Sequence, residues 1–110
     1  MAHDTEKTLP SLKDGLDLGS VASLLGLPEA QLIAMTGIIS RRTEADNAAL
    51  GVRVREIVEV INRVEPWTGG KQQALIWFRG QGLPAFGDQT AEALLKRGMA
   101  DAVRSYLDGM

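Results

Sequence analysis

Residues 43–66, TEADNAALGVRVREIVEVINRVEP, decide the fold of this 110-residue chain. Apolar residues recur there at the three- and four-residue spacing of one helix face, and the charged residues lie off that face. Thr43 suits an N-cap, Asp46 stands where a capping box has its acid, and Pro66 is expected to end the helix. We therefore predict a long linking helix over residues 43–65. Its seam would face a core or a second copy of the chain, and it comprises Leu50, Val54, Ile57, Val58, Ile61 and Val64.

Residues 16–42, which precede this helix, are expected to form a degenerate helix-turn-helix lobe. In LDLGSVASLLGLPEAQLIAMTG (16–37), Ala22 stands where two helices would touch, Gly26 suits the turn, and Pro28 suits a first helical position. Five apolar positions complete the pattern: Val21, Leu25, Leu27, Leu32 and Met35. Residues 1–15 are polar and lack a sustained period, so we expect a flexible N-terminal tail.

The charge distribution argues against strong DNA binding by this motif. Residues 1–40 carry two Lys against five Asp and Glu, whereas residues 41–110 carry ten Lys and Arg against nine acids. Binding to DNA depends on cations that face the phosphates. On the second motif helix only Gln31 suits base reading, and Arg41 and Arg42 follow it as phosphate contacts. DNA binding is therefore a weak prediction, and the motif is expected mainly to be a scaffold.

Residues 66–110 are predicted to form a small helical lobe. KQQALIWF (71–78) is rich in helix formers, and Trp77 within it is expected to join the apolar seam. LPAFGDQ (83–89) is expected to be an irregular loop. Thr90 suits the N-cap of a helix over residues 91–97, Gly98 stops that helix, and residues 99–107 form the last one. Because no alternating strand pattern occurs, we predict an all-α fold.

This lobe resembles the toxin-binding domain of Xre/MbcA/ParS antitoxins, which has a Trp near a helix end, a Pro-containing loop with Gly, a Thr-x-x-x-Leu-Leu helix, a Gly and a Val-x-x-Leu helix. The match covers about residues 54–108. The matching positions are Trp77, Pro84, Gly87, Thr90, Leu94, Leu95, Gly98, Val103 and Leu107.

The resemblance implies a homodimeric antitoxin of a type II toxin–antitoxin system. Such a protein occludes its cognate toxin, commonly a RES-type enzyme that consumes NAD, and often represses its own operon. It needs no cofactor and performs no chemistry. Carried onto this chain, the toxin-binding candidates are Pro84, Phe86, Gly87, Arg97, Met99, Arg104 and Tyr106.

Composition excludes several other classes of protein. Apolar residues make up 45% and charged residues 24% of the chain, as in ordinary globular proteins, and cysteine is absent. No run of about 18 apolar residues occurs, so we expect a cytoplasmic protein without a membrane span. His3 is the only histidine, and Glu56 and Glu59 are expected to form a charged helix face, with Arg63 four residues after Glu59, rather than a metal site.

Accidental enzyme motifs are weak as well. Residues 80–85 spell G-x-G-x-x-A but follow a helix rather than a strand, and Gly70-Lys71 lacks the Ser or Thr of a phosphate-binding loop. We therefore expect no enzyme and no bound metal. Two alternatives to the antitoxin remain open: a DNA-binding transcriptional regulator, and an orphan helical dimerisation or adaptor module.

Overall fold

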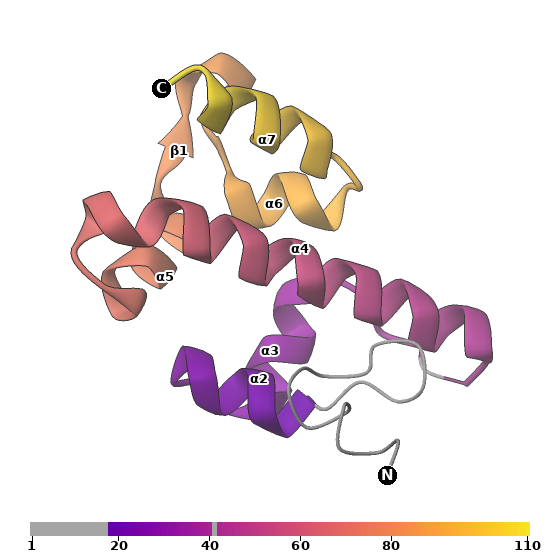
Figure 1. Ribbon diagram of the computed structural model, residues 1–110. Coiled ribbons are helices and arrows are strands. Elements are labelled where there is room, and N and C mark those ends of the chain that lie inside the picture. The colour runs from indigo at the N-terminus through magenta and orange to yellow at the C-terminus, as the bar shows by residue number, and fades with distance from the viewer. Residues whose placement is uncertain (1–17, 41) are drawn as a thin grey trace, which may run out of the picture.

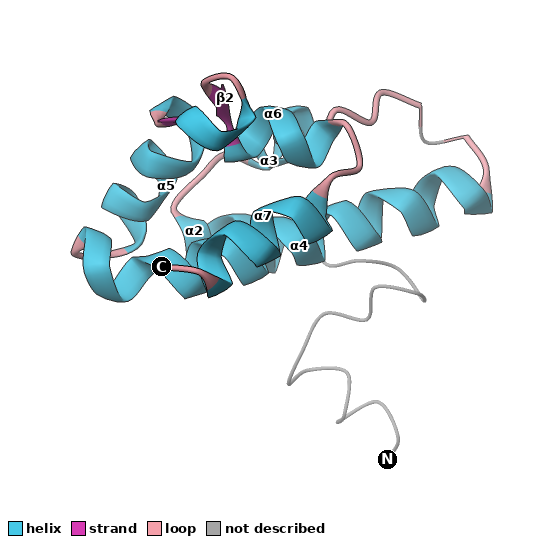
Figure 2. Ribbon diagram, turned by 90° about the horizontal axis from the view of Figure 1, so that it is seen from above, coloured by secondary structure: helices cyan, strands magenta, loops and turns pink. Residues whose placement is uncertain are grey.

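The computed structural model describes residues 18–40 and 42–110 and confirms the predicted all-α fold. A long central helix crosses the molecule, with the two N-terminal helices on one side and the two C-terminal helices on the other (Figure 1). The view from above shows how completely helices dominate the structure (Figure 2). In chain order, the helices are α2 (Leu18–Leu25), α3 (Glu29–Thr36), α4 (Glu44–Thr68), α5 (Lys71–Gly80), α6 (Ala91–Lys96) and α7 (Ala100–Asp108).

Helix α4 begins at the predicted capping box and ends beyond the predicted boundary. The Thr43 side chain accepts a hydrogen bond from the Asp46 backbone, and the Asp46 carboxylate accepts one from the Thr43 backbone. The Ser40 hydroxyl also donates to Asp46 at 2.8 Å, and it is the main cause of the lowered pKa of that carboxyl group. The predicted stop at Pro66 was wrong. Proline removes one backbone donor, but the last turn still closes through the Gly69 N–H and the Glu65 carbonyl, 3.1 Å apart.

The apolar seam of α4 lies inside the core of a single chain. Five of its six predicted members are buried, Val58 is partly buried against them, and Val60, which the pattern missed, is buried too. Trp77 is partly buried and packs against this core. Its neighbour Phe78 is fully buried, whereas Trp77 lies at the margin of the core and meets Trp67 edge to face, with ring centroids 5.5 Å apart. On a helix, adjacent residues point about 100° apart, so only one of the two can face α4.

Helices α2 and α3 meet at a tight turn. Gly26 has a φ of +73°, and the next amide, Leu27, donates to the Ala22 carbonyl at 2.9 Å. The chain bends by 96° between the two helices. Across residues 18–40 and 42–110, no single helix is long and apolar enough to cross a membrane, and α2 and α3 meet that criterion only as this bent pair.

The segment between α5 and α6 corrects the predicted irregular loop. Strands β1 (Gly82–Leu83) and β2 (Gln89–Thr90) pair in antiparallel fashion around a 3₁₀ turn over Pro84–Phe86. The Asp88 amide closes the hairpin by donating to the Leu83 carbonyl at 3.0 Å. Two-residue strands are too short for the alternation that reveals a strand in a sequence. Thr90 then caps α6 as predicted, accepting a hydrogen bond from the Ala93 amide.

Candidate functional site

The hairpin and helix α7 bring the predicted aromatic candidates together. Phe86 and Tyr106 lie with their ring centroids 6.0 Å apart at an interplanar angle of 60°, and both are partly buried against the core. Pro84 and Gly87, at either end of the turn, are exposed. An edge-to-face aromatic pair of this kind is a rigid apolar anchor, because each ring limits the rotamers of the other.

Arg97 is connected to the same turn by hydrogen bonds. Its Nη1 donates to Gln89 Oε1 at 2.6 Å, and Gln89 Nε2 donates to the Phe86 carbonyl at 3.2 Å. Met99, two residues later, is partly buried against the core. The sequence pattern missed Gln89, because its role depends on a hairpin that the sequence did not predict.

Arg104 forms ion pairs with two carboxylates of its own chain. Its Nε and Nη2 bind the two carboxylate oxygens of Glu59 at 2.8 and 2.9 Å, and its Nη1 binds Asp101 at 2.5 Å. These bonds raise the pKa of Arg104, chiefly through Glu59, and the Arg104 hydrogen bonds are the main cause of the lowered pKa of Glu59. The guanidinium thus connects α7 to α4, and three of its five N–H donors bind carboxylates of this chain.

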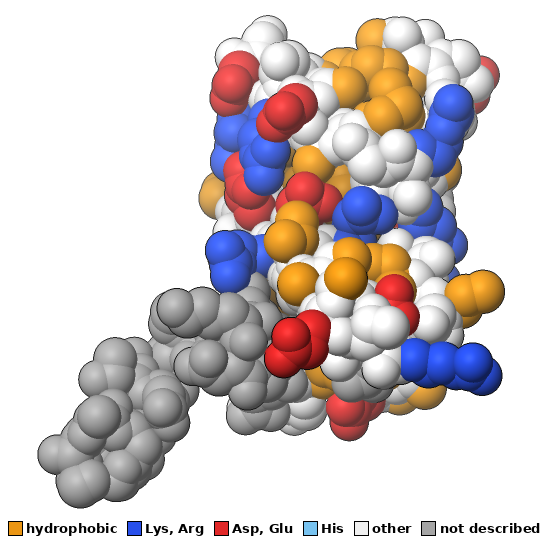
Figure 3. Space-filling model, turned by 90° about the vertical axis from the view of Figure 1, so that its right-hand side faces the viewer, with side chains coloured by type: hydrophobic (Ala, Val, Ile, Leu, Met, Phe, Trp, Pro, Cys, Tyr) orange, Lys and Arg blue, Asp and Glu red, His pale blue; other side chains and the backbone are white. Residues whose placement is uncertain are grey.

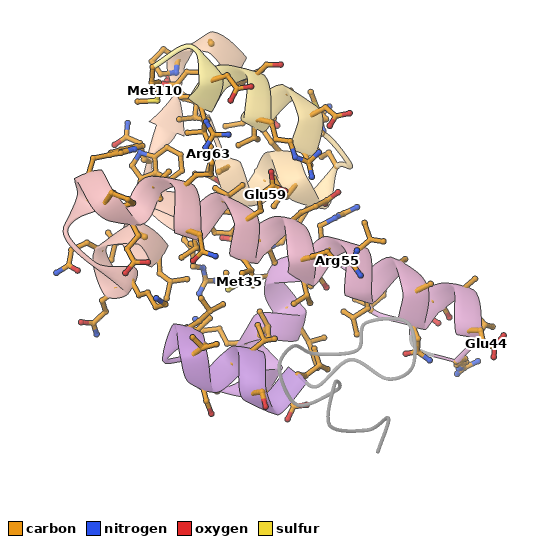
Figure 4. The ribbon with its side chains drawn as sticks, viewed as in Figure 1. Met35, Glu44, Arg55, Glu59, Arg63 and Met110 are labelled. Atoms are coloured by element: carbon orange, nitrogen blue, oxygen red, sulfur yellow. The ribbon has the colours of Figure 1, made fainter. Side chains whose placement is uncertain are left out.

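A second ion pair fixes the far end of α7. Arg63 Nη2 lies 2.9 Å from Asp108 Oδ1, and Figure 4 shows Glu59 and Arg63 on the side of α4 that faces α7. Glu59 and Arg63 were expected to share a charged helix face, and each binds a residue of α7. The charge of Arg63 also helps to lower the pKa of Glu59. Glu56, which was grouped with Glu59, binds Arg53 at 2.9 Å. Two ion pairs therefore connect α7 to α4.

The DNA-binding candidates do not form a basic surface in the part of the chain that the structure describes. Gln31 is partly buried, Arg42 is exposed before α4, and Arg41 lies outside the described residues. Helix α3 carries Glu29 and neither Lys nor Arg. Its outer side borders a small cavity of about 270 Å³ lined by Ala30, Ile33, Ala34, Gly37, Ile38 and Ile39. On the face of the molecule in Figure 3, acidic, basic and apolar side chains are interspersed.

A larger groove lies between the end of α2 and helix α5, on residues that the sequence did not single out. Its volume is about 760 Å³. Leu24 and Ile76, both more than half exposed, are among its lining residues. Neither belongs to a predicted apolar stripe. Large apolar residues that lie off the core-facing side of a helix remain at the surface, so these two positions indicate an exposed apolar patch.

Among residues 18–40 and 42–110, no cluster of three or more His, Asp or Glu side chains could hold a metal ion. His3 lies outside the described residues. Comparison of the chain with protein-family models, curated proteins and solved structures finds no match.

Proposed function

We propose that this chain is the antitoxin of a type II toxin–antitoxin pair and that it neutralises a RES-type, NAD-consuming toxin by steric occlusion. The observation that carries the proposal is the Phe86–Tyr106 pair, held at the surface by a closed hairpin and by a helix that is ion-paired to α4. The sequence resemblance to Xre/MbcA/ParS antitoxins supports the same reading.

Rigid support of this surface favours tight binding. Ordering flexible side chains on association costs about 0.5–1.5 kcal/mol for each one, and aromatic residues that are already restrained avoid most of that cost. Aromatic residues and arginine are also the side chains that most often dominate binding energy at interfaces. We therefore assign the toxin-binding face to Pro84, Phe86, Gly87, Arg97, Met99 and Tyr106, with Arg104 acting as a positioning residue.

A homodimer belongs to this proposal but needs a different surface from the one the sequence suggested. The predicted seam of α4 is buried inside a single chain, so it has no area left for a second copy. Autorepression through DNA is the weaker alternative, because α3 presents one acidic residue and no cation. A role as an orphan adaptor would use the same face with another protein partner.

The proposal is tested by co-expressing the chain with the toxin encoded beside it. The parent should restore growth and cellular NAD, Tyr106→Ala should lose at least about tenfold in affinity for the purified toxin, and Tyr106→Phe, which keeps the ring, should retain it. Arg97→Ala should weaken rescue, whereas Arg42→Ala, at an exposed position before α4, should not. Full rescue by a folded Tyr106→Ala protein would disprove the assigned face, and no rescue by the parent would disprove the function.

A further inference from the structure

The groove between α2 and α5 is a second apolar surface, separate from the hairpin and α7. One wall is the end of α2 with its turn, and the other is one face of α5. Leu24 is 66% exposed and Ile76 is 70% exposed. The described residues that line it are Ser23, Leu24, Leu25, Gly26, Leu27, Lys71, Gln72, Leu75, Ile76, Arg79 and Gly80.

The shape of the groove suits a helix. The α5 wall runs along one face of that helix from Lys71 to Arg79, which corresponds to about 12 Å, or roughly two turns. Helices docked in apolar grooves are anchored by side chains at positions i, i+3 or i+4, and i+7, which cover the same length. Two turns of a partner helix could therefore lie along α5 with their apolar side chains between Leu24 and Ile76.

The charges at the groove are one-sided. Lys71 and Arg79 line it, and none of the described lining residues is acidic. Lys71 contacts Glu65 at 3.2 Å, so its charge is balanced by its own chain. Arg79 contacts Glu92 at 3.1 Å, but Glu92 also binds Lys96 at 3.2 Å, so one carboxylate serves two cations. The Arg79 end of the groove thus keeps a net positive charge.

We propose that this groove binds an amphipathic helix of a partner protein whose apolar stripe is flanked by acidic side chains. The apolar stripe would cover Leu24 and Ile76, and the acidic flank would face Arg79. This inference is independent of the toxin-binding face, because the two surfaces share no residue. It makes the chain a protein with two docking surfaces.

A second copy of this chain fits the groove less well. In a two-fold dimer the same patch lies on both subunits, so the lining of one groove would meet the lining of the other. That arrangement brings the positive Arg79 end of one groove toward the same patch of the partner, and none of the described lining residues is acidic. Like charges brought together in an interface oppose binding, whereas an acidic partner gains attraction.

The test uses the full chain and two synthetic helical peptides of about 16 residues. Both carry the same leucine stripe, flanked by Glu in one and by Lys in the other. Amide chemical shifts and fluorescence anisotropy follow binding. We expect the Glu peptide to shift amides of residues 24–27 and 71–80, and to bind at least about tenfold more tightly than the Lys peptide. Ile76→Ser should weaken it by a similar factor.

Val52→Ser is the matched control, because Val52 is 51% exposed on α4 and lies outside the groove; it should leave peptide binding unchanged. The proposal is overturned if the Glu peptide does not bind, shifts amides elsewhere, or binds no better than the Lys peptide. It is also overturned by a dimer that Ile76→Ser dissociates, which identifies a second copy as the occupant. Shifts in residues 1–17 on Ile76→Ser without peptide would instead identify the chain's own N-terminal segment.

Discussion

The absence of one methyl group at Gly82 allows the hairpin under the candidate face to close. A Cβ at this position would lie 2.7 Å from the Asp88 carbonyl oxygen, which is backbone and has little freedom to move. Gly80, two residues earlier, has open space around the same position. A side chain can therefore be added at Gly80 without a clash, but not at Gly82.

Gly82→Ala should destabilise the fold by about 1–3 kcal/mol, the usual cost of overpacking, because β1 must move away from Asp88. Gly80→Ala should instead be neutral or stabilise by up to about 1 kcal/mol, since alanine restricts the unfolded chain and favours the helix. Urea unfolding of the two variants measures the difference. Equal stability of both would show that β1 does not pack closely on Asp88 in solution.

Helix α7 depends for its position on charged residues far away in sequence. Arg104 binds Glu59 with both carboxylate oxygens engaged, and Arg63 binds Asp108 near the other end. Val103 and Leu107 bury the apolar side of α7 in the core, which fixes its depth. The ion pairs therefore act mainly on the orientation of α7 and of Tyr106. Their contribution to the free energy of unfolding is small.

Glu59→Gln should lower the free energy of unfolding by only about 0.5 kcal/mol at pH 7, because the pair is partly exposed and screened. The pKa of Glu59 is lowered in the folded state, so the folded protein binds fewer protons than the unfolded chain. The contribution is thus present above the unfolded pKa of Glu59 and is lost as the pH falls through the folded one. Urea titrations across that range should show parent and variant converging in acid; a constant gap would contradict the assignment.

The whole molecule is organised around the buried face of α4. That face contacts α3, α5, α6 and α7, and one core joins residues from both ends of the described chain. The N-terminal and C-terminal lobes also touch directly, since α3 contacts α6 and a Cβ at Gly37 would lie 2.9 Å from the Lys96 side chain. A defect on this face should therefore propagate to both lobes.

Ile57→Asp should unfold the chain, because it places an unpaired charge at a position with no exposure to water. Val52→Asp, at a half-exposed position five residues earlier on the same helix, should leave the fold intact. Circular dichroism and thermal melts distinguish the two variants. A folded monomeric Ile57→Asp protein would mean that α4 packs through another face.

Helix formation and helix ends could be predicted from the sequence because their causes are local. The apolar period of α4, the Thr43 capping box, the Thr90 cap and the turn at Gly26 each depend on residues within a few positions of one another. The Pro66 boundary failed because proline removes only its own backbone donor, and the residues after it can stay helical, so α4 continues to Thr68.

Only the tertiary structure decided which faces meet. Whether the α4 seam faced a core or a second copy depended on helices distant in sequence. The burial of Phe78 and the pairing of Glu59 with Arg104 depended on them too. The groove between α2 and α5 arises in the same way, from Leu24 and Ile76 on separate helices. Periodicity within a helix specifies that one side is apolar, but packing against other helices determines what covers it, because burial is a property of the assembled molecule.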